Sequence, residues 1–196
     1  MSNWEKVASE LLKESAIKAG VFTEVSSQSI SVGFKRLNDG ATIPSKAHPT
    51  DSGFDLYASE DVIIEPGETV IVPTGIAVEL PKGFEVQVRP RSGVTAKTKL
   101  RVQLGTIDNG YKGEIGVIVD NIADDPFGNT SRYLNFVDGS EIRQDDDIPD
   151  GTYHIRKGDR IAQLVVQALP EVTAVEIDDF TEGSERGEGG FGSTGV

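Results

Sequence analysis

The 196-residue chain contains no cysteine, one methionine and one tryptophan. Without cysteine it has neither a disulfide framework nor a thiolate metal site. It also lacks any run of about 18 apolar residues, which excludes a membrane-spanning helix, so no membrane partner is expected. Positive charge is scarce: 19 Lys and Arg stand against 32 Asp and Glu, a net charge of −13. Because binding along a nucleic acid requires clustered cations, this balance excludes nucleic acid as a partner but not a small phosphorylated ligand held with a divalent metal.

The length suits one domain with a core, with or without appendages. The first residues, MSNWEKVASELLKESA, do not show the basic-then-apolar order of a secretory signal. A cytoplasmic protein is therefore expected.

Residues 2–20 have the pattern of a helix. Ser2 and Glu5 form a capping box, and Gly20 stands where a left-handed cap would end it. One face carries apolar residues at helical spacing, so it must be buried, either on its own domain or a neighbouring subunit or against a dedicated partner. The following residues, to 28, resemble a linker.

From residue 29 to 182 we expect one β domain. Short apolar runs broken by Pro and Gly recur every 8–10 residues across 61–90, and further runs lie at 114–121, 132–137, 152–155, 160–169 and 172–177. No helical pattern separates these runs, so a parallel sheet with crossover helices is not expected. The pattern predicts an all-β fold: an antiparallel sandwich, a jelly roll or a barrel.

Residues 123–150 form an acidic segment with eight acidic and two basic side chains. We expect solvated loops around one short strand. The run Asp145–Asp147 lacks the spaced oxygen ligands and closing Glu of a calcium loop, which favours a solvated face over a metal site.

Four turns carry groups capable of chemistry. They contain Asp55, the Arg91–Ser92–Gly93 stretch, Asp108 with Tyr111, and Gln163. Backbone N–H groups converging beside Arg91 would form an anion nest. Taken singly, each has an ordinary interpretation: the aspartates as turn formers, Arg91 as a surface cation, and Gln163 as an edge-strand amide.

Their joint order is more informative. DSGFDLYAS (51–59), RPRSGVTAK (89–97), GTIDNGYKGEIG (105–116), KGDRIAQLVV (157–166) and RGEGGFGSTG (186–195) together resemble the five motifs of the trimeric all-β dUTPases, over residues 30–196. The resemblance implies a jelly-roll-like β barrel, a homotrimer with active sites at subunit interfaces, and Mg²⁺-dependent hydrolysis of dUTP to dUMP and pyrophosphate.

The resemblance assigns a role to each motif. Asp108 would direct the attacking water, Tyr111 would exclude a 2′-hydroxyl, and the backbone of Gly105, Thr106 and Ile107 would read uracil. The phosphates would meet Arg91, Ser92, Gly93 and Gln163. Asp55 would contact Mg²⁺ through water, with the ion held mainly by the phosphates.

The last 14 residues, 183–196, contain six of the chain's 22 glycines. We interpret them as a flexible arm that orders on substrate. In it Arg186 matches a γ-phosphate ligand, Phe191 the ring that stacks on uracil, and Gly192, Ser193 and Thr194 further phosphate contacts. A solvated, frayed terminus is the alternative.

Three points stay open. Val102 and Gln103 stand where many relatives have asparagine and proline, so uracil recognition would rely on the main chain. The segment 123–150 resembles an extra segment of staphylococcal-type phage dUTPases, some of which bind a repressor protein, so a nucleotide-gated regulatory role, alone or added to catalysis, is an alternative. A dCTP deaminase, which shares the fold, is the other, although IDNGYKG fits the hydrolase better.

Overall fold

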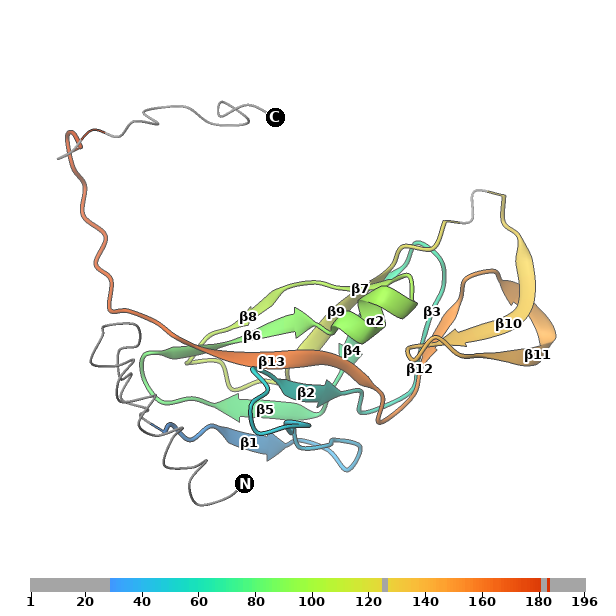
Figure 1. Cartoon of the computed structure of the whole chain (residues 1–196), viewed down its shortest axis with the longest axis horizontal. Coiled ribbons are helices and arrows are strands. Elements are labelled where there is room, and N and C mark those ends of the chain that lie inside the picture. Colours follow the sequence, from blue (N-terminus) through green and yellow to red (C-terminus); the bar gives the residue numbers. More distant parts are fainter. Residues whose placement is uncertain (1–28, 125–126, 181–182, 184–196) are drawn as a thin grey trace, which may run out of the picture.

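The computed structural model describes residues 29–124, 127–180 and 183 (Figure 1). The predicted helix over 2–20, its linker and the arm residues 184–196 lie outside the described residues. The strands are β1 (Gly33–Arg36), β2 (Phe54–Tyr57), β3 (Val62–Ile64), β4 (Thr69–Pro73), β5 (Ile76–Glu79), β6 (Phe84–Pro90), β7 (Leu100–Val102), β8 (Gly105–Ile107), β9 (Gly116–Asn121), β10 (Thr130–Phe136), β11 (Glu141–Pro149), β12 (Tyr153–Ile155) and β13 (Arg160–Ala168). One short helix, α2 (Ser92–Lys97), accompanies them in this part of the chain.

The strands form four small sheets, with orders β1-β5, β11-β10-β12-β3, β2-β13-β6-β8 and β4-β9-β7. Every pairing is antiparallel except that of β10 with β12. The all-β prediction is confirmed, and the sheets wrap around one elongated body (Figure 1). No helix in the described residues is long and apolar enough to span a bilayer.

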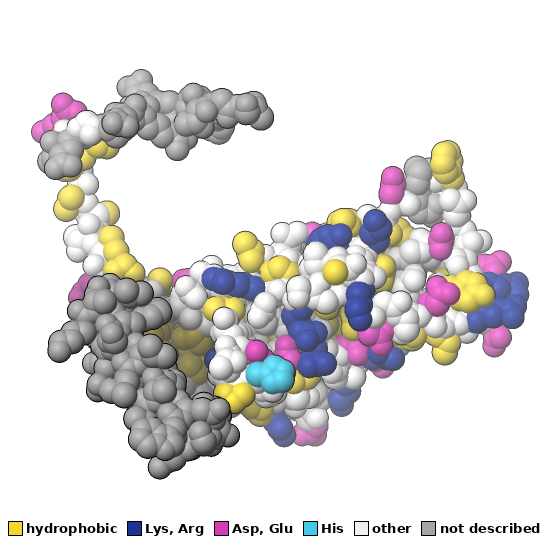
Figure 2. Space-filling model, viewed as in Figure 1, with side chains coloured by type: hydrophobic (Ala, Val, Ile, Leu, Met, Phe, Trp, Pro, Cys, Tyr) yellow, Lys and Arg dark blue, Asp and Glu magenta, His cyan; other side chains and the backbone are white. Residues whose placement is uncertain are grey.

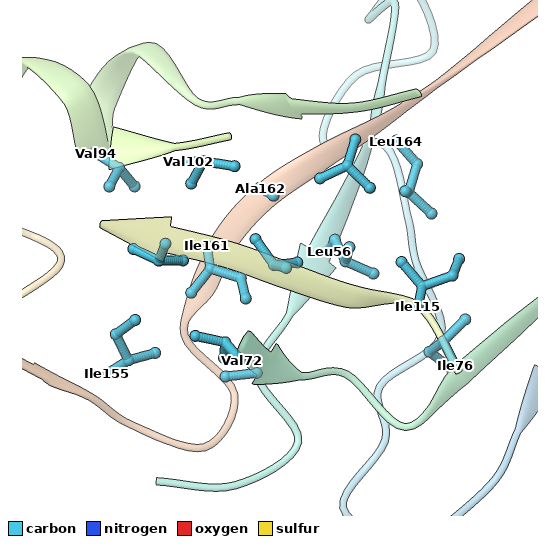
Figure 3. Packing of buried hydrophobic residues seen from close by; sticks show 14 of the residues in the cluster. Leu56, Val72, Ile76, Val94, Val102, Ile115, Ile155, Ile161, Ala162 and Leu164 are labelled. Carbon is cyan, nitrogen blue, oxygen red and sulfur yellow. The ribbon is translucent and has the colours of Figure 1, made fainter. Parts of the chain in front are cut away.

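The core follows from alternation along the strands. In β9, Val117 and Val119 are fully buried while Ile118 between them is exposed. Figure 3 shows Leu56, Ile161 and Leu164, from β2 and β13, packed with residues of the facing sheet. Each such side chain contributes about 1.5–3 kcal/mol on burial. The core therefore lies under β13, the strand that also carries Gln163.

The acidic segment differs from its prediction. Most of it is a hairpin, β10–β11, with a register shift between Ser131 and Tyr133, and it projects from one end of the body (Figure 1). Residues 143–149, expected in a loop, belong to the nine-residue strand β11, which is exposed along most of its length. Since water reaches both of its faces, the strand has no apolar alternation for sequence reasoning to detect.

Two further expectations were wrong. Residues 172–177 are not a strand: Val172 and Val175 are 78% and 75% exposed, and the extended chain there leaves the body without a partner strand among the described residues (Figure 1). The helix α2 was not expected between β6 and β7. It spans only six residues, with Val94 as its single buried side chain, which is too short for a periodic signal.

Candidate active site

One cavity of about 420 Å³ collects three of the predicted motifs. Asp55 comes from β2, Arg91 to Gly93 from the β6–α2 junction, and Gln163 from β13. Sheet register explains the meeting, because Gln163 lies opposite Asp55 on one side and Arg89 on the other. We call this the phosphate cavity.

Asp55 bridges two arginines in this cavity. Its Oδ1 is 2.9 Å from Arg91 Nε, and its Oδ2 is 3.2 Å from Arg160 Nη1. Arg91 also donates from Nη1 to the Arg160 carbonyl at 3.0 Å. The Asp55 side chain is 15% exposed and that of Arg91 26%, so this pair is better shielded than a surface ion pair, whereas Arg160 is 50% exposed. The pair with Asp55 fixes the direction of the Arg91 guanidinium.

Gln163 is positioned by its neighbours. Its Nε2 donates to the Pro90 carbonyl at 3.0 Å, directly before Arg91. A β-carbon on Gly53 would lie 2.5 Å from Gln163 Oε1 and 3.1 Å from Gln163 Cβ, so a larger residue there would displace the Gln163 amide. Gly93, in contrast, has nothing within 4 Å of where a β-carbon would lie. The backbone at Gly93 is therefore open to an incoming anion.

A second cavity, of about 430 Å³, holds the third motif. Thr106, Ile107, Asp108 and Tyr111 line it, together with Ile71 and Ile118 from the sheet β4-β9-β7. β8 is an edge strand, so the backbone groups on one of its sides have no partner strand in the described residues. Gly105 begins that strand opposite Val88 but does not line the cavity. We call this the nucleoside cavity.

The loop after β8 is tightly anchored. Tyr111 N donates to the Asp108 carbonyl at 3.0 Å, and the Tyr111 hydroxyl donates to the Glu114 carbonyl at 2.9 Å. The Glu114 carboxylate accepts from Gly75 N at 2.6 Å and from Thr74 N at 3.1 Å. Asn109 Nδ2 donates to the carbonyls of Leu80 and Pro81, at 3.1 and 2.7 Å. The Asp108 carboxylate is thus presented, exposed, from a fixed turn.

The two unusual residues that precede the third motif face elsewhere. Val102 is buried, and Gln103 donates its amide to the Asp120 carboxylate on β9. Neither lines the nucleoside cavity. The main chain of the edge strand β8 stays available beside Ile107 and Asp108.

The two cavities do not meet within one chain. They share no lining residue, and Ile107 pairs with Val86 while Arg91 follows five residues later along the same sheet. At about 3.4 Å per residue, roughly 17 Å separate the two backbones. Asp108 and Arg91 of the same chain are therefore well separated. The structure therefore gathers Asp55, Arg91, Ser92, Gly93 and Gln163 in one place and Thr106, Ile107, Asp108 and Tyr111 in another.

The five predicted arm residues lie outside the described residues: Arg186, Phe191, Gly192, Ser193 and Thr194. For Mg²⁺, the described residues offer no group of three or more His, Asp or Glu that could hold an ion. Asp55 is already paired with two arginines. Among these residues a Mg²⁺ ion would need most of its oxygen ligands from outside the protein, such as water or phosphate.

Sequence reasoning missed Arg160 and Glu114. Arg160 contacts a residue 105 positions away, a relationship that no local pattern reveals. Glu114 lies inside the third motif, yet its bonds go to a separate turn 39 and 40 residues away. In both cases only the tertiary structure identifies the partner.

The sequence model of the family described as dUTPase matches residues 39–131 and 150–195. The deoxyuridine 5′-triphosphate nucleotidohydrolase of Clostridioides difficile is 40% identical over 163 residues, covering 82% of this chain and 95% of the relative. The chain belongs to the dUTPase family. The predicted family is confirmed, and with it the predicted enzyme class of dUTP diphosphatase.

Solved dUTPases of staphylococcal phages have the same fold. The dUTPase of phage 80α is 36% identical, with a TM-score of 0.81, over 86% of this chain and all of its own. That structure contains dUPNHPP, and it was solved in work on phage dUTPases that control the transfer of virulence genes. A point mutant of the dUTPase from phage φ11 of S. aureus, described with a structural Mg(II) ion, is 31% identical with a TM-score of 0.75, over 78% of this chain and all of its own. The family model leaves residues 132–149 unmatched, and these form most of β10–β11.

Proposed function

We propose that this member of the dUTPase family hydrolyses dUTP to dUMP and pyrophosphate by attack of water on the α-phosphorus, with Asp108 directing the water. The observation that carries the proposal is the placement of Asp108. It lies exposed at the end of the edge strand β8, in a cavity shared with Tyr111, on a loop fixed by Glu114. A fixed carboxylate suits this reaction because in-line phosphoryl transfer needs positioning and charge neutralisation more than covalent chemistry.

We further propose a homotrimer in which each active site combines the nucleoside cavity of one chain with the phosphate cavity of another. The roughly 17 Å between them within one chain supports this arrangement. The exposed Ile71 (69%) and Ile118 (42%) beside Asp108 supply an apolar surface for such a contact. The arm carrying Arg186 and Phe191 would then cover the assembled site.

In this proposal Mg²⁺ enters with the substrate. It offsets phosphate charge, while Arg91, the backbone at Ser92 and Gly93, and the amide of Gln163 hold phosphate oxygens. The uracil edge pairs with the free backbone of β8, and Tyr111 lies against the deoxyribose. Asp55 keeps Arg91 aligned and meets the ion through water. We expect the protein to act in the cytoplasm.

Turnover of dUTP, dTTP, UTP and dCTP, assayed with and without EDTA, tests substrate and metal together. We expect pyrophosphate release from dUTP alone, and loss of release with EDTA. Asp108→Asn should lower kcat by about 10³-fold or more while the enzyme still binds dUpNHpp. Release of ammonia from dCTP would instead identify a deaminase.

A regulatory role is a second candidate, favoured by the projecting hairpin and by the phage 80α relative. We propose that β10–β11 is the surface that a repressor protein would contact. Replacing residues 132–149 by a short turn should abolish capture of such a partner yet keep hydrolysis. If both activities were lost, the hairpin would be structural and this role would fall.

A further inference from the structure

Asn109 ties the start of the loop after β8 to a turn on the body of the protein. Its Nδ2 donates to the Leu80 carbonyl at 3.1 Å and to the Pro81 carbonyl at 2.7 Å. We propose that Asn109 is a positioning residue for catalysis, whose amide sets the place of Asp108 in the nucleoside cavity. The inference rests on the proposed hydrolysis, and it concerns a residue to which the predicted motif roles assign nothing.

The Asn109 side chain is directed at the body and not at the substrate. Asn109 is half-buried, whereas Asp108 before it and Gly110 after it are exposed, and it does not line the nucleoside cavity. The Phe84 carbonyl lies 3.5 Å from the same Nδ2, so carbonyl oxygens surround the amide group. A side-chain amide supplies two N–H donors from one nitrogen, which suits two carbonyl acceptors. Asn109 therefore acts through its neighbour Asp108.

The turn that accepts these bonds is itself fixed. The Leu80 side chain is 7% exposed and belongs to the core. On the other side of the turn, the Gly83 carbonyl accepts from Leu169 N at 2.7 Å, directly after the end of β13. Figure 1 shows this turn between β5 and β6, at the end of the body where the chain leaves β13. Asn109 is thus bonded to a part of the body that is held from two sides.

Two anchors divide the loop between them. Strand β5 (Ile76–Glu79) separates their acceptors and donors, because Asn109 is bonded to the turn after it and Glu114 to the turn before it. The Tyr111 hydroxyl donates to the Glu114 carbonyl, so the ring belongs to the second anchor. Loss of the Asn109 amide should therefore displace Asp108 more than Tyr111.

This division predicts a specific kinetic signature. A displacement of about 1 Å misaligns the water that Asp108 directs, which lowers the rate of the chemical step. The contacts proposed for uracil, deoxyribose and phosphate come from β8, Tyr111 and the phosphate cavity, and these do not depend on Asn109. The turnover number should fall while nucleotide binding and sugar discrimination stay level.

Asn109→Leu tests this, because leucine has a similar size and no donor. We expect kcat for dUTP to fall about tenfold to a hundredfold, with affinity for dUpNHpp within about twofold of the parent's. The ratio of kcat/KM for dUTP over that for UTP should also stay within about twofold. Asn109→Gln keeps the amide on a longer stem and should recover part of the lost kcat.

Asn135→Leu is the matched control. Asn135 Nδ2 likewise donates to a backbone carbonyl, that of Thr152, at 3.0 Å. It lies on β10 at the other end of the body, where Figure 2 shows charged side chains of both signs. The melting temperature should fall by a similar amount in Asn135→Leu and Asn109→Leu, but kcat should fall in Asn109→Leu alone.

A kcat for Asn109→Leu equal to that of the parent or of Asn135→Leu would overturn the inference. So would a fall in kcat with an equal loss of dUpNHpp binding and sugar discrimination, since the amide would then support the whole loop. Hydrogen exchange of residues 107–112 tests the anchor without turnover and should be faster in Asn109→Leu than in Asn135→Leu. If exchange changed in this way but the parent did not cleave dUTP, the proposed function would fail and the anchor would stand.

Discussion

The Glu114 carboxylate accepts a 2.6 Å hydrogen bond from the backbone N–H of Gly75, which links the loop after β8 to the turn before β5. The same oxygen accepts from Thr74 at 3.1 Å. Through this link the loop that carries Asp108 and Tyr111 is tied to the body. Glu114 therefore acts on the site by positioning it.

Glu114→Ala should lower kcat about tenfold to a hundredfold, because a displacement of Asp108 near 1 Å misaligns the water. It should also lower the free energy of unfolding by roughly 1–3 kcal/mol, since two backbone donors lose their acceptor. Glu114→Gln keeps an acceptor and should recover most of both quantities. Steady-state kinetics and chemical denaturation measure them; equal kcat for parent and alanine variant would contradict the positioning role.

Gly113→Ala tests the role of Tyr111. A β-carbon at position 113 would lie 2.5 Å from the Tyr111 hydroxyl oxygen, so the ring must move. We expect the ratio of kcat/KM for dUTP over UTP to fall by about tenfold as the ribose becomes tolerated. Gly110→Ala is the control in the same loop, because nothing lies within 4 Å of its added carbon. Unchanged discrimination in Gly113→Ala would remove Tyr111 from sugar selection.

Gly93→Ala separates binding from stability. The added methyl group meets nothing within 4 Å in the free protein, and alanine is favoured over glycine in a helix such as α2. The melting temperature should therefore stay level or rise. KM for dUTP should increase about tenfold, because the methyl group occupies the space where phosphate approaches the backbone. Unchanged KM would argue against an anion nest at this turn.

The hairpin turn should respond to acid. Hydrogen bonds from the Ser140 hydroxyl and backbone N–H lower the pKa of Asp138, and Arg156 lowers it further. Because the unfolded-state pKa is about 3.9, the stabilisation is fully present above that pH and is lost as pH falls through the lower folded-state pKa. Its size should be under about 1 kcal/mol, since the group is exposed. Thermal unfolding of the parent and Asp138→Asn should differ at pH 6 and converge near pH 2; a constant difference would contradict this linkage.

Sequence reasoning located the strands that alternate between core and solvent. The runs in 61–90 became β3 to β6, and 114–121 contained β9, because buried Val and Ile side chains and Pro-Gly turns leave a local signature. Strand β11 has no such signature, since a strand that is exposed on both faces can carry polar residues such as Asp and Arg along its length. Residues 172–177 had the composition of a strand but no neighbouring strand in the described chain to pair with.

Part of the site could be predicted because its motifs also leave a local signature in the sequence. The motifs identified Asp55, Arg91 and Gln163, and β-sheet register brought them together. The ion pair between Arg160 and Asp55 spans 105 residues and depends on that register, so it could not be seen in the sequence. The separation of Asp108 from Arg91 likewise follows from the pairing of β8 with β6.

A subunit-mixing experiment tests the central claim, that Asp108 of one chain serves phosphates held by Arg91 of another. Asp108→Asn and Arg91→Gln should each be nearly inactive alone. When the two chains are unfolded together and reassembled, about a quarter of the sites should combine an intact Asp108 with an intact Arg91, and dUTP hydrolysis should return in proportion. Mixed oligomers that form but remain as inactive as either variant alone would contradict the account.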